Sequence, residues 1–375
     1  MLNDDIQVIS VDDHVVEPPN VWQDHLPAKF KEDGPRGERD DQGRDIWMFE
    51  GTPRFNGGLG AVAGKDRKDY GLDPVSYDEM RRGCYDIEAR VADMDIDGVQ
   101  AELCFPTFPG FAGGTFYAAK DKELATACVS AYNDWMIDDW CGAAPGRQIP
   151  MVLVPFWDVE SCTQEIQRVA AKGAKAITFP EAPHNIGLPS FHTTHWDPLF
   201  AAAQDADLPL CMHFGSGGTP NVAPDGPFTA AIALFGLNSQ QCTVELVNSR
   251  VFERFPRLKV ALSEGGIGWI PYILERCDYT WERHRWYTGM ETAKRPSEIF
   301  REHIYGCFIA DDAGLRNIDL IGEDNITFEC DYPHSDSNWP HTRKMLAEAM
   351  VNVPDDQVRK IVETNARKLF NFPRR

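Results

Sequence analysis

The chain has 375 residues, of which 43% are hydrophobic and 25% are charged. This is the composition of a globular protein with ample material for a core, and it excludes a disordered or fibrous chain. Acidic residues outnumber basic ones by 58 to 37, and the resulting formal charge of −21 repels phosphate backbones and anionic lipid surfaces. We therefore expect neither a nucleic acid nor a membrane as a partner.

The N-terminal sequence, MLNDDIQVIS, lacks the basic region and apolar run of a signal peptide. No stretch approaches the roughly eighteen apolar residues of a membrane helix. The ten cysteines are scattered without a CxxC pair, so neither a disulfide framework nor a thiolate zinc site is indicated. We expect a cytoplasmic protein whose cysteines are mostly reduced and buried.

Short apolar runs rich in β-branched residues recur along the chain, and most are separated by segments of helix length. The expected strands are 6–12, 99–105, 149–156, 174–179, 208–214, 258–263, 304–309 and 326–330. Amphipathic helices are expected at 85–94, 121–141, 159–172, 197–206, 239–255 and 268–285. This order predicts parallel βα units, which form either a closed barrel or an open doubly wound sheet. The open sheet is disfavoured because no GxGxxG motif follows the first strand. We therefore predict an α/β fold, a (β/α)8 TIM barrel, as a single domain over residues 1–375.

Residues 18–78 fit this repeat poorly, because they are rich in Gly, Pro, Asp and Arg. A loop of this length inside a compact domain is usually a functional lid or a small subdomain, although an ordinary surface excursion explains it equally well. We expect a long, lid-like insertion after the first strand.

The polar residues at the strand ends suggest a metal site. In a barrel of this kind, the side chains that end the strands converge at one rim. Asp12 and His14 lie two positions apart on the first strand and so share a side, and later strand ends supply His213, Glu264 and Asp331. Each of these residues could instead end a turn, cap a helix or form a hydrogen bond in the core. However, burying several ionisable groups at the same end of the barrel costs free energy unless they are paired or bind a metal ion. The mixed nitrogen and oxygen set suits zinc, manganese or iron(II).

Seven segments of the chain together resemble the amidohydrolase-2 family, the group related to aminocarboxymuconate semialdehyde decarboxylase, over nearly the whole length. They are VDDHVVEPP (11–19), ADMDIDGVQAELCFP (92–106), AYNDWM (131–136), GLPSFHTTHWDPLFAA (187–202), FPRLKVALSEGGIGWIPY (255–272), DYPHSDSNWP (331–340) and TNARKLF (364–370).

The resemblance implies a barrel with one divalent metal ion at the strand ends. Its ligands would be Asp12, His14, His213 and Asp331, with water at the remaining position. We expect zinc first, with manganese or iron as alternatives. The resemblance alone also leads us to expect a homodimer.

Glu264 departs from the family pattern, in which decarboxylases place a histidine at the end of the sixth strand. A carboxylate cannot replace an imidazole donor at neutral pH unless burial keeps it protonated, but it can accept a proton from a metal-bound water. Our first hypothesis is therefore a metal-dependent hydrolase that attacks an amide, ester or thioester carbonyl of a small hydrophobic or aromatic substrate. Asp331 or Glu264 would accept the proton while His213 holds the ion.

Two other functions stay open. One is a metal-dependent non-oxidative decarboxylase of an aromatic or unsaturated carboxylic acid, which the family resemblance favours. The other is a barrel that has lost catalysis and serves as a binding or scaffold protein. A serine hydrolase is disfavoured because the chain contains no G-x-S-x-G segment.

Further residues are expected around the site. His334 is a candidate substrate contact, and His192 and His195 either line the pocket or fix their loop. Glu181 is more simply explained as a loop residue. Aromatic residues in the loops after the first two strands would form apolar walls or pack the lid: Trp22, Phe55, Tyr70, Phe108, Phe111 and Phe116.

Overall fold

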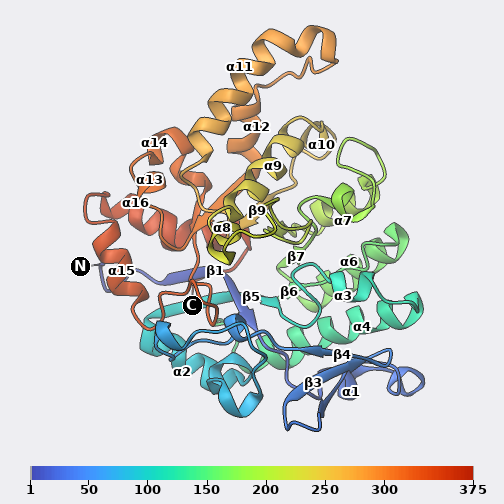
Figure 1. Ribbon diagram of the computed structural model, residues 1–375. Helices are drawn as coiled ribbons and strands as arrows, with labels where there is room; N and C mark the ends of the chain where they lie inside the picture. Colours follow the sequence, from blue (N-terminus) through green and yellow to red (C-terminus); the bar gives the residue numbers. More distant parts are fainter. Residues whose placement is uncertain (1, 375) are drawn as a thin grey trace.

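The computed structural model describes residues 2–374, and within them eight parallel strands with surrounding helices confirm the barrel architecture (Figure 1). The strands are β1 (Val8–Val15), β5 (Val99–Pro106), β6 (Met151–Val152), β7 (Ala176–Thr178), β8 (Leu210–His213), β9 (Val260–Ser263), β10 (Ile304–Phe308) and β11 (Ile326–Phe328). β1 pairs with β5, and β6 to β11 form a second ladder in chain order. At the two seams, the Ile149 N–H donates to the Glu102 carbonyl at 2.8 Å and the Asp331 N–H donates to the Asp12 carbonyl at 2.9 Å.

Helices cover the outside of the strands (Figure 1). The longer ones are α2 (Ile87–Asp97), α4 (Lys122–Asp134), α6 (Val159–Lys172), α7 (Asp197–Asp205), α9 (Phe235–Val247), α11 (Ile270–Thr288), α12 (Pro296–His303) and α15 (Thr342–Ala349). The shorter ones include α3 (Gly114–Tyr117), α5 (Cys141–Ala143), α8 (Phe228–Ile232), α10 (Val251–Arg254), α13 (Asp312–Leu315), α14 (Ile318–Ile321), α16 (Asp355–Arg359) and α17 (Asn365–Leu369). In α6 both helix ends are specified by the sequence. The Asp158 side chain caps the N-terminus by accepting the Ser161 N–H, and Gly173 ends the helix with a φ of 102°.

A register shift in β1 turns the functional side chains toward the barrel interior. Ile9 and Val11 belong to the buried cluster that fills the barrel, whereas Val15 packs into a separate outer cluster. The β1–β5 pairing is irregular between Ser10 and Asp13, where three steps on β1 oppose two on β5. An irregularity of this kind reverses the alternation of side chains, and Asp12 consequently faces inward.

The insertion after β1 is an ordered, packed unit. It contains α1 (Val21–His25) and an antiparallel sheet of β2 (Arg36–Arg39), β3 (Asp45–Phe49) and β4 (Thr52–Phe55), which are drawn in blue in Figure 1. Trp22 and Trp47 of the insertion pack against Phe108, with ring centroids 5.0 and 4.9 Å from it. The insertion is thus anchored to the segment after β5, and its action as a lid stays a prediction.

Some boundaries differ from the sequence expectations. The strand expected at 149–156 is hydrogen-bonded only over Met151–Val152. The helix expected at 239–255 is divided into α9 and α10, because Arg250 takes a left-handed conformation with a φ of 59°. All ten cysteines are buried and free, as predicted. Among residues 2–374, no helix combines the length and apolarity needed to cross a bilayer.

Candidate metal centre

Asp12 and His14 lie side by side on β1, and both are fully buried. Nε2 of His14 lies 3.4 Å from Oδ1 of Asp12. The main chain of His14 is held from two directions, since its N–H donates to the Tyr332 carbonyl at 2.6 Å and its carbonyl accepts from the buried Arg90 guanidinium at 2.5 Å. These contacts fix the end of the strand from which both side chains project.

His213 is the last residue of β8, and a hydrogen bond orients its ring. Nδ1 lies 2.7 Å from the Phe214 carbonyl, and because a carbonyl can only accept, Nδ1 carries the proton while Nε2 presents a lone pair. This lone pair faces Oδ2 of Asp12 at 3.6 Å and Oε2 of Glu264 at 3.0 Å. Such a group of acceptors directed at one another suits a bound cation.

Asp331 follows β11 and completes the group from the far end of the chain. Its Oδ1 lies 3.3 Å from Nε2 of His14 and 3.1 Å from Nδ1 of His334. Its φ of 56° is unusual for a residue other than glycine, and the hydrogen bond from its N–H to the Asp12 carbonyl holds it in that conformation.

The donor atoms of these residues fit a divalent metal ion. Asp12, His14 and His213 offer ligand atoms within 4.8 Å of one another, as do His14, Asp331 and His334. Both carboxylate oxygens of Asp12 and Asp331, and Nε2 of His14 and His213, are buried without a hydrogen-bond partner among residues 2–374. A buried polar atom without a partner costs about 1–3 kcal/mol, so their concentration at one place indicates a ligand-binding position. Mixed carboxylate and imidazole donors suit manganese, zinc or iron(II).

The electrostatics of the protein alone show why a cation belongs here. Burial raises the pKa of Asp12 and of Asp331 well above the usual range, and the nearby Glu264 carboxylate adds to both shifts. Burial lowers the pKa of His213 and of His334 to about 3. The imidazoles are therefore neutral, as metal ligands must be, and a dication would stabilise the ionised carboxylates that burial disfavours.

Glu264 is held at the edge of this group by a second carboxylate that the sequence analysis did not single out. Glu264 has a φ of 57°, and its N–H donates to Oε2 of Glu329 at 3.0 Å. Glu329 is buried and also accepts from the Cys307 thiol. The sequence signal for Glu329 was its position two residues before Asp331, because residues two apart in an extended segment project to the same side. Burial raises the pKa of Glu264 well above its usual range, which is the condition under which a carboxyl group can act as a donor.

His334 links the buried group to the outside. Its ring stacks on His14 with centroids 3.6 Å apart, and its side chain is 18% exposed, whereas the side chains of His14, His213 and Asp331 are 0% exposed. On the opposite side, Phe111 stacks on His213 at 3.8 Å. His334, expected as a substrate contact, and Phe111, expected in an apolar wall or in lid packing, therefore both lie at the cluster.

Three residues expected to contact substrate lie elsewhere. His192 and His195 are exposed, and Nε2 of His192 pairs with Oε2 of Glu245 at 2.7 Å. Trp22 is fully buried in the insertion, and its Nε1 donates to the Cys128 carbonyl on α4 at 3.1 Å. The structure therefore assigns Trp22 to packing and gives no support to substrate contact by His192 or His195.

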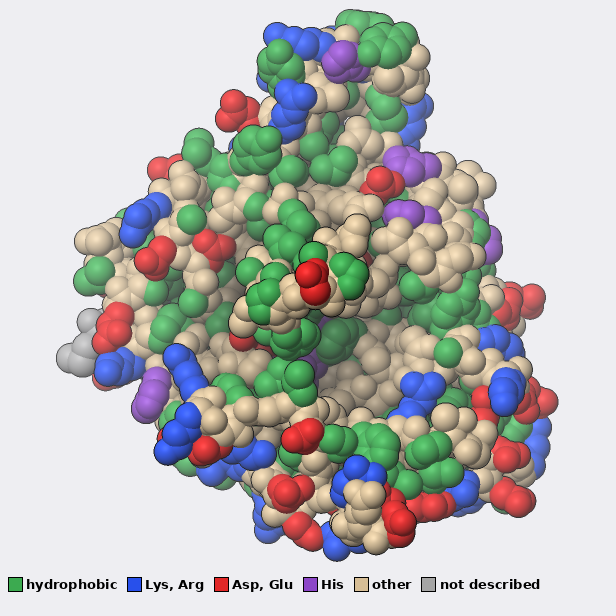
Figure 2. Space-filling view, viewed as in Figure 1, with side chains coloured by type: hydrophobic (Ala, Val, Ile, Leu, Met, Phe, Trp, Pro, Cys, Tyr) green, Lys and Arg blue, Asp and Glu red, His purple; other side chains and the backbone are tan. Residues whose placement is uncertain are grey.

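A cavity of about 540 Å³ lies between the insertion, α8 and the segment that follows His334. Its lining residues are Leu59, Arg67, Tyr70, Gly71, Leu72, Phe228, Ile232, Ser335 and Asp336. Figure 2 shows a hollow near the middle of this face, with hydrophobic side chains around it and histidine side chains at its floor. Of the clustered side chains, His334 is the one that is partly open to the outside, at 18% exposure.

Glu181 supports the loop after β8, as the simpler interpretation of the sequence predicted. Its Oε1 accepts from the Gly215 N–H and from the Asn238 side chain, both at 2.7 Å. Its N–H in turn donates to the Ser216 hydroxyl at 3.1 Å. These bonds hold the loop that immediately follows His213.

The chain is similar to decarboxylases in sequence. It is 25% identical over 331 residues to the gamma-resorcylate decarboxylase of Rhizobium radiobacter, covering 80% of this chain and 93% of that protein. It is 22% identical over 270 residues to the 2-amino-3-carboxymuconate-6-semialdehyde decarboxylase of Dictyostelium discoideum, covering 70% of each.

Solved structures share the fold over nearly the whole chain. The amidohydrolase map2389c of Mycobacterium avium subsp. paratuberculosis K-10 superposes with a TM-score of 0.73 at 22% identity, covering 98% of this chain and 99% of that one. The 5-carboxyvanillate decarboxylase LigW of Sphingomonas paucimobilis gives 0.69 at 23% identity, covering 98% and 100%. The dihydroxybenzoic acid decarboxylase of Polaromonas sp. JS666, with bound manganese and the inhibitor 2-nitroresorcinol, gives 0.67 at 18% identity, covering 98% of each chain.

These comparisons correct the first functional hypothesis. Hydrolysis of an amide, ester or thioester was the wrong prediction, because the curated relatives that match the chain are decarboxylases. Hydrolysis would require an ionised Glu264 carboxylate, whereas burial raises the pKa of this group well above its usual range.

The family itself follows from the match over most of the chain. The sequence profile of the amidohydrolase family covers residues 21–372. The chain therefore belongs to the amidohydrolase family.

Proposed function

We propose that the protein is a metal-dependent, non-oxidative decarboxylase of an aromatic or unsaturated carboxylic acid, with hydroxylated benzoates as the first substrate class. The observation that carries the proposal is the buried set of carboxylate and imidazole atoms without hydrogen-bond partners, at the rim of a barrel whose curated relatives are decarboxylases. In the proposal, Asp12, His14, His213 and Asp331 hold one divalent ion.

Manganese is the first candidate for this ion, ahead of zinc. The Polaromonas decarboxylase of the same fold holds manganese, and the two carboxylates offered here are oxygen donors that manganese accepts readily. When bound, the ion would supply a Lewis acid that polarises a carboxylate or phenolic oxygen of the substrate.

The chain provides an aromatic surface beside the proposed ligands. Phe111 stacks on His213, and Phe235 stacks on Phe214 with centroids 3.7 Å apart. A flat aromatic substrate would find apolar faces there, while the partly exposed His334 can donate to a substrate oxygen.

Decarboxylation also requires a proton, because the bond from the ring carbon to the carboxyl carbon breaks, carbon dioxide leaves and a C–H bond forms. We assign the delivery of this proton to Glu264. Its carboxyl group faces the cluster at 3.0 Å from Nε2 of His213, and its main chain is fixed by the bond to Glu329. Glu264 stands outside both groups of ligand atoms, so it is free to exchange a proton with the substrate.

The test is carbon dioxide release by the manganese-loaded enzyme from a panel that includes 2,6-dihydroxybenzoate and 5-carboxyvanillate, run beside amide and ester substrates. We expect carbon dioxide from at least one aromatic acid, and we expect Glu264→Gln to bind manganese normally while releasing carbon dioxide at least ~100-fold more slowly. The matched control is His195→Gln, which removes an exposed imidazole and should leave the rate unchanged. Ester or amide hydrolysis without any carbon dioxide release would refute the proposal, and full activity of Glu264→Gln would refute the role of that residue.

A further inference from the structure

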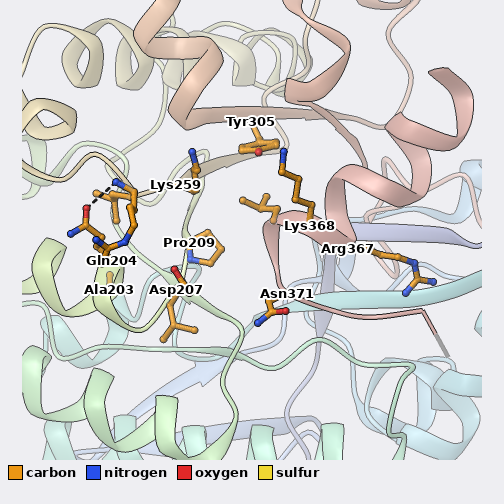
Figure 3. A pocket seen from close by; sticks show the side chains of 13 residues that line it. Ala203, Gln204, Asp207, Pro209, Lys259, Tyr305, Arg367, Lys368 and Asn371 are labelled. Atoms are coloured by element: carbon orange, nitrogen blue, oxygen red, sulfur yellow. Dashed lines mark hydrogen bonds between the residues drawn. The ribbon is translucent and has the colours of Figure 1, made fainter. Parts of the chain in front are cut away.

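A second cavity lies at the opposite end of the barrel from the proposed metal centre. It has a volume of about 540 Å³ and is lined by residues that come just before β8 and β9, by Tyr305 at the start of β10, and by the C-terminal segment around α17. The metal-centre side chains His213, Glu264 and Asp331 instead stand at or beyond the ends of their strands. We call this second cavity the basal cavity, and Figure 3 shows it from close by.

The basal cavity has a charge opposite to that of the molecule. The protein carries a formal charge of −21, yet the cavity is lined by Arg257, Lys259, Arg367 and Lys368, and Asp207 is the single acidic residue among its described lining residues. A local concentration of cations in an acidic protein produces a short-range attraction for anions that the field of the whole molecule does not supply.

The two lysines are the cations of the cavity that are not paired with a carboxylate among residues 2–374. Arg257 pairs with Asp205 at 2.9 Å, and Arg367 pairs with Glu363 at 3.1 Å. Lys259 donates to the main-chain carbonyl of Glu302, and across residues 2–374 neither Lys259 nor Lys368 forms an ion pair with a carboxylate.

The two ammonium groups also act on each other. Burial lowers the pKa of Lys259, and the nearby positive charge of Lys368 lowers it further, while the Glu302 carboxylate acts in the opposite direction. In Figure 3 the two lysine side chains stand on either side of the Tyr305 ring. An anion between them would replace this repulsion by two attractive contacts.

We propose that the basal cavity binds a small polyanion of the chemistry shared by phosphate esters and dicarboxylates. Lys259 and Lys368 would contribute the charge, while the Asn371 amide and the Tyr305 hydroxyl, which also line the cavity, would contribute neutral donors. The volume lies within the range of about 300–1,000 Å³ that is usual for small-molecule sites. This site is separate from the decarboxylase proposal, and either can fail without the other.

The experiment is isothermal titration calorimetry of the full chain with pyrophosphate and with succinate, in chloride buffer of low ionic strength. Lys259→Gln and Lys368→Gln each remove one cation, and Lys368 is exposed, so its variant folds without burying a new group. The matched control is Lys344→Gln, at an exposed lysine on α15. His213→Ala is the second control, because it disables the proposed metal centre, to which pyrophosphate could otherwise bind.

We expect saturable binding of at least one probe with a stoichiometry near one, and a rise in Kd of about tenfold for each of the two cavity variants, as the loss of one charge-assisted contact predicts. Lys344→Gln and His213→Ala should bind as the wild type does. Tighter binding of pyrophosphate would identify the phosphate class, and tighter binding of succinate the dicarboxylate class. The proposal is overturned if neither probe binds saturably, if the Lys259→Gln/Lys368→Gln double variant binds normally, or if His213→Ala abolishes binding.

Discussion

Replacement of Glu181 by Gln should stabilise the protein at alkaline pH. The Glu181 side chain is buried, and burial raises its pKa from the ordinary value of 4.5 to about 7. The folded state therefore binds this proton more tightly than the unfolded state does, and stability is lost as pH rises through the range between those values. A pKa change of this size corresponds to ~3 kcal/mol once the pH is well above 7.

The variant Glu181→Gln removes the charge and keeps the useful hydrogen bonds. One amide oxygen can accept from Gly215 and Asn238 as Oε1 does now, and the other carboxylate oxygen, Oε2, is buried without a partner among residues 2–374. We expect the stability difference between Glu181→Gln and wild type to grow by ~2.5 kcal/mol from pH 5 to pH 8, in favour of the variant.

Urea unfolding followed by circular dichroism at pH 5, 6, 7 and 8 measures this difference, with the same metal concentration in every sample. The control is Glu348→Gln, which removes the same charge from an exposed glutamate on α15. A difference for Glu181→Gln that is constant, or that shrinks as pH rises, would show that the buried charge does not govern the loop after β8.

Further predictions concern the metal centre and the residues that hold it. Asp331→Asn and His213→Ala should each weaken metal binding by more than ~100-fold, measured in competition with a fluorescent chelator. The control variant His195→Gln should bind the metal normally. Normal metal affinity in either ligand variant would contradict the assignment. Arg90→Met should lower the free energy of unfolding by ~3–5 kcal/mol, because it leaves the carboxylate of Glu102, now paired at 2.8 Å, buried and uncompensated; a loss below ~1 kcal/mol would contradict this reasoning. Removal of metal by a chelator should lower the Tm and manganese should restore it, because the ion binds only the folded state; an unchanged Tm would argue against a site formed by folding.

The barrel and the group at its rim were predictable because both depend on regular spacing. Alternating strands and helices indicate parallel units, and the ends of parallel strands converge whatever the loops contain. His213 and Asp331 could therefore be assigned to one rim although more than a hundred residues separate them. Asp12 and His14 were also predicted to share one side of the first strand, but that this side faces the barrel interior depends on a register shift that no sequence pattern revealed.

The parts that the sequence left open or that were interpreted wrongly depend on burial and packing, which local sequence does not fix. Trp22 sits in a polar, glycine-rich segment that looks like an open lid, yet tertiary packing against α4 buries it completely. Glu264 was interpreted as a proton acceptor because it stands where related decarboxylases have a histidine, and because a carboxylate is ionised at neutral pH unless burial keeps it protonated. Its pKa is set by its surroundings in space, where it is buried and where Glu329 supports its main chain.

The most direct test of the account is a crystal structure of the manganese-loaded protein with anomalous scattering recorded at the manganese edge. We expect one strong anomalous peak at the rim of the barrel, within bonding distance of Asp12, His14, His213 and Asp331. The absence of a peak there, or a peak bound by other residues, would contradict it.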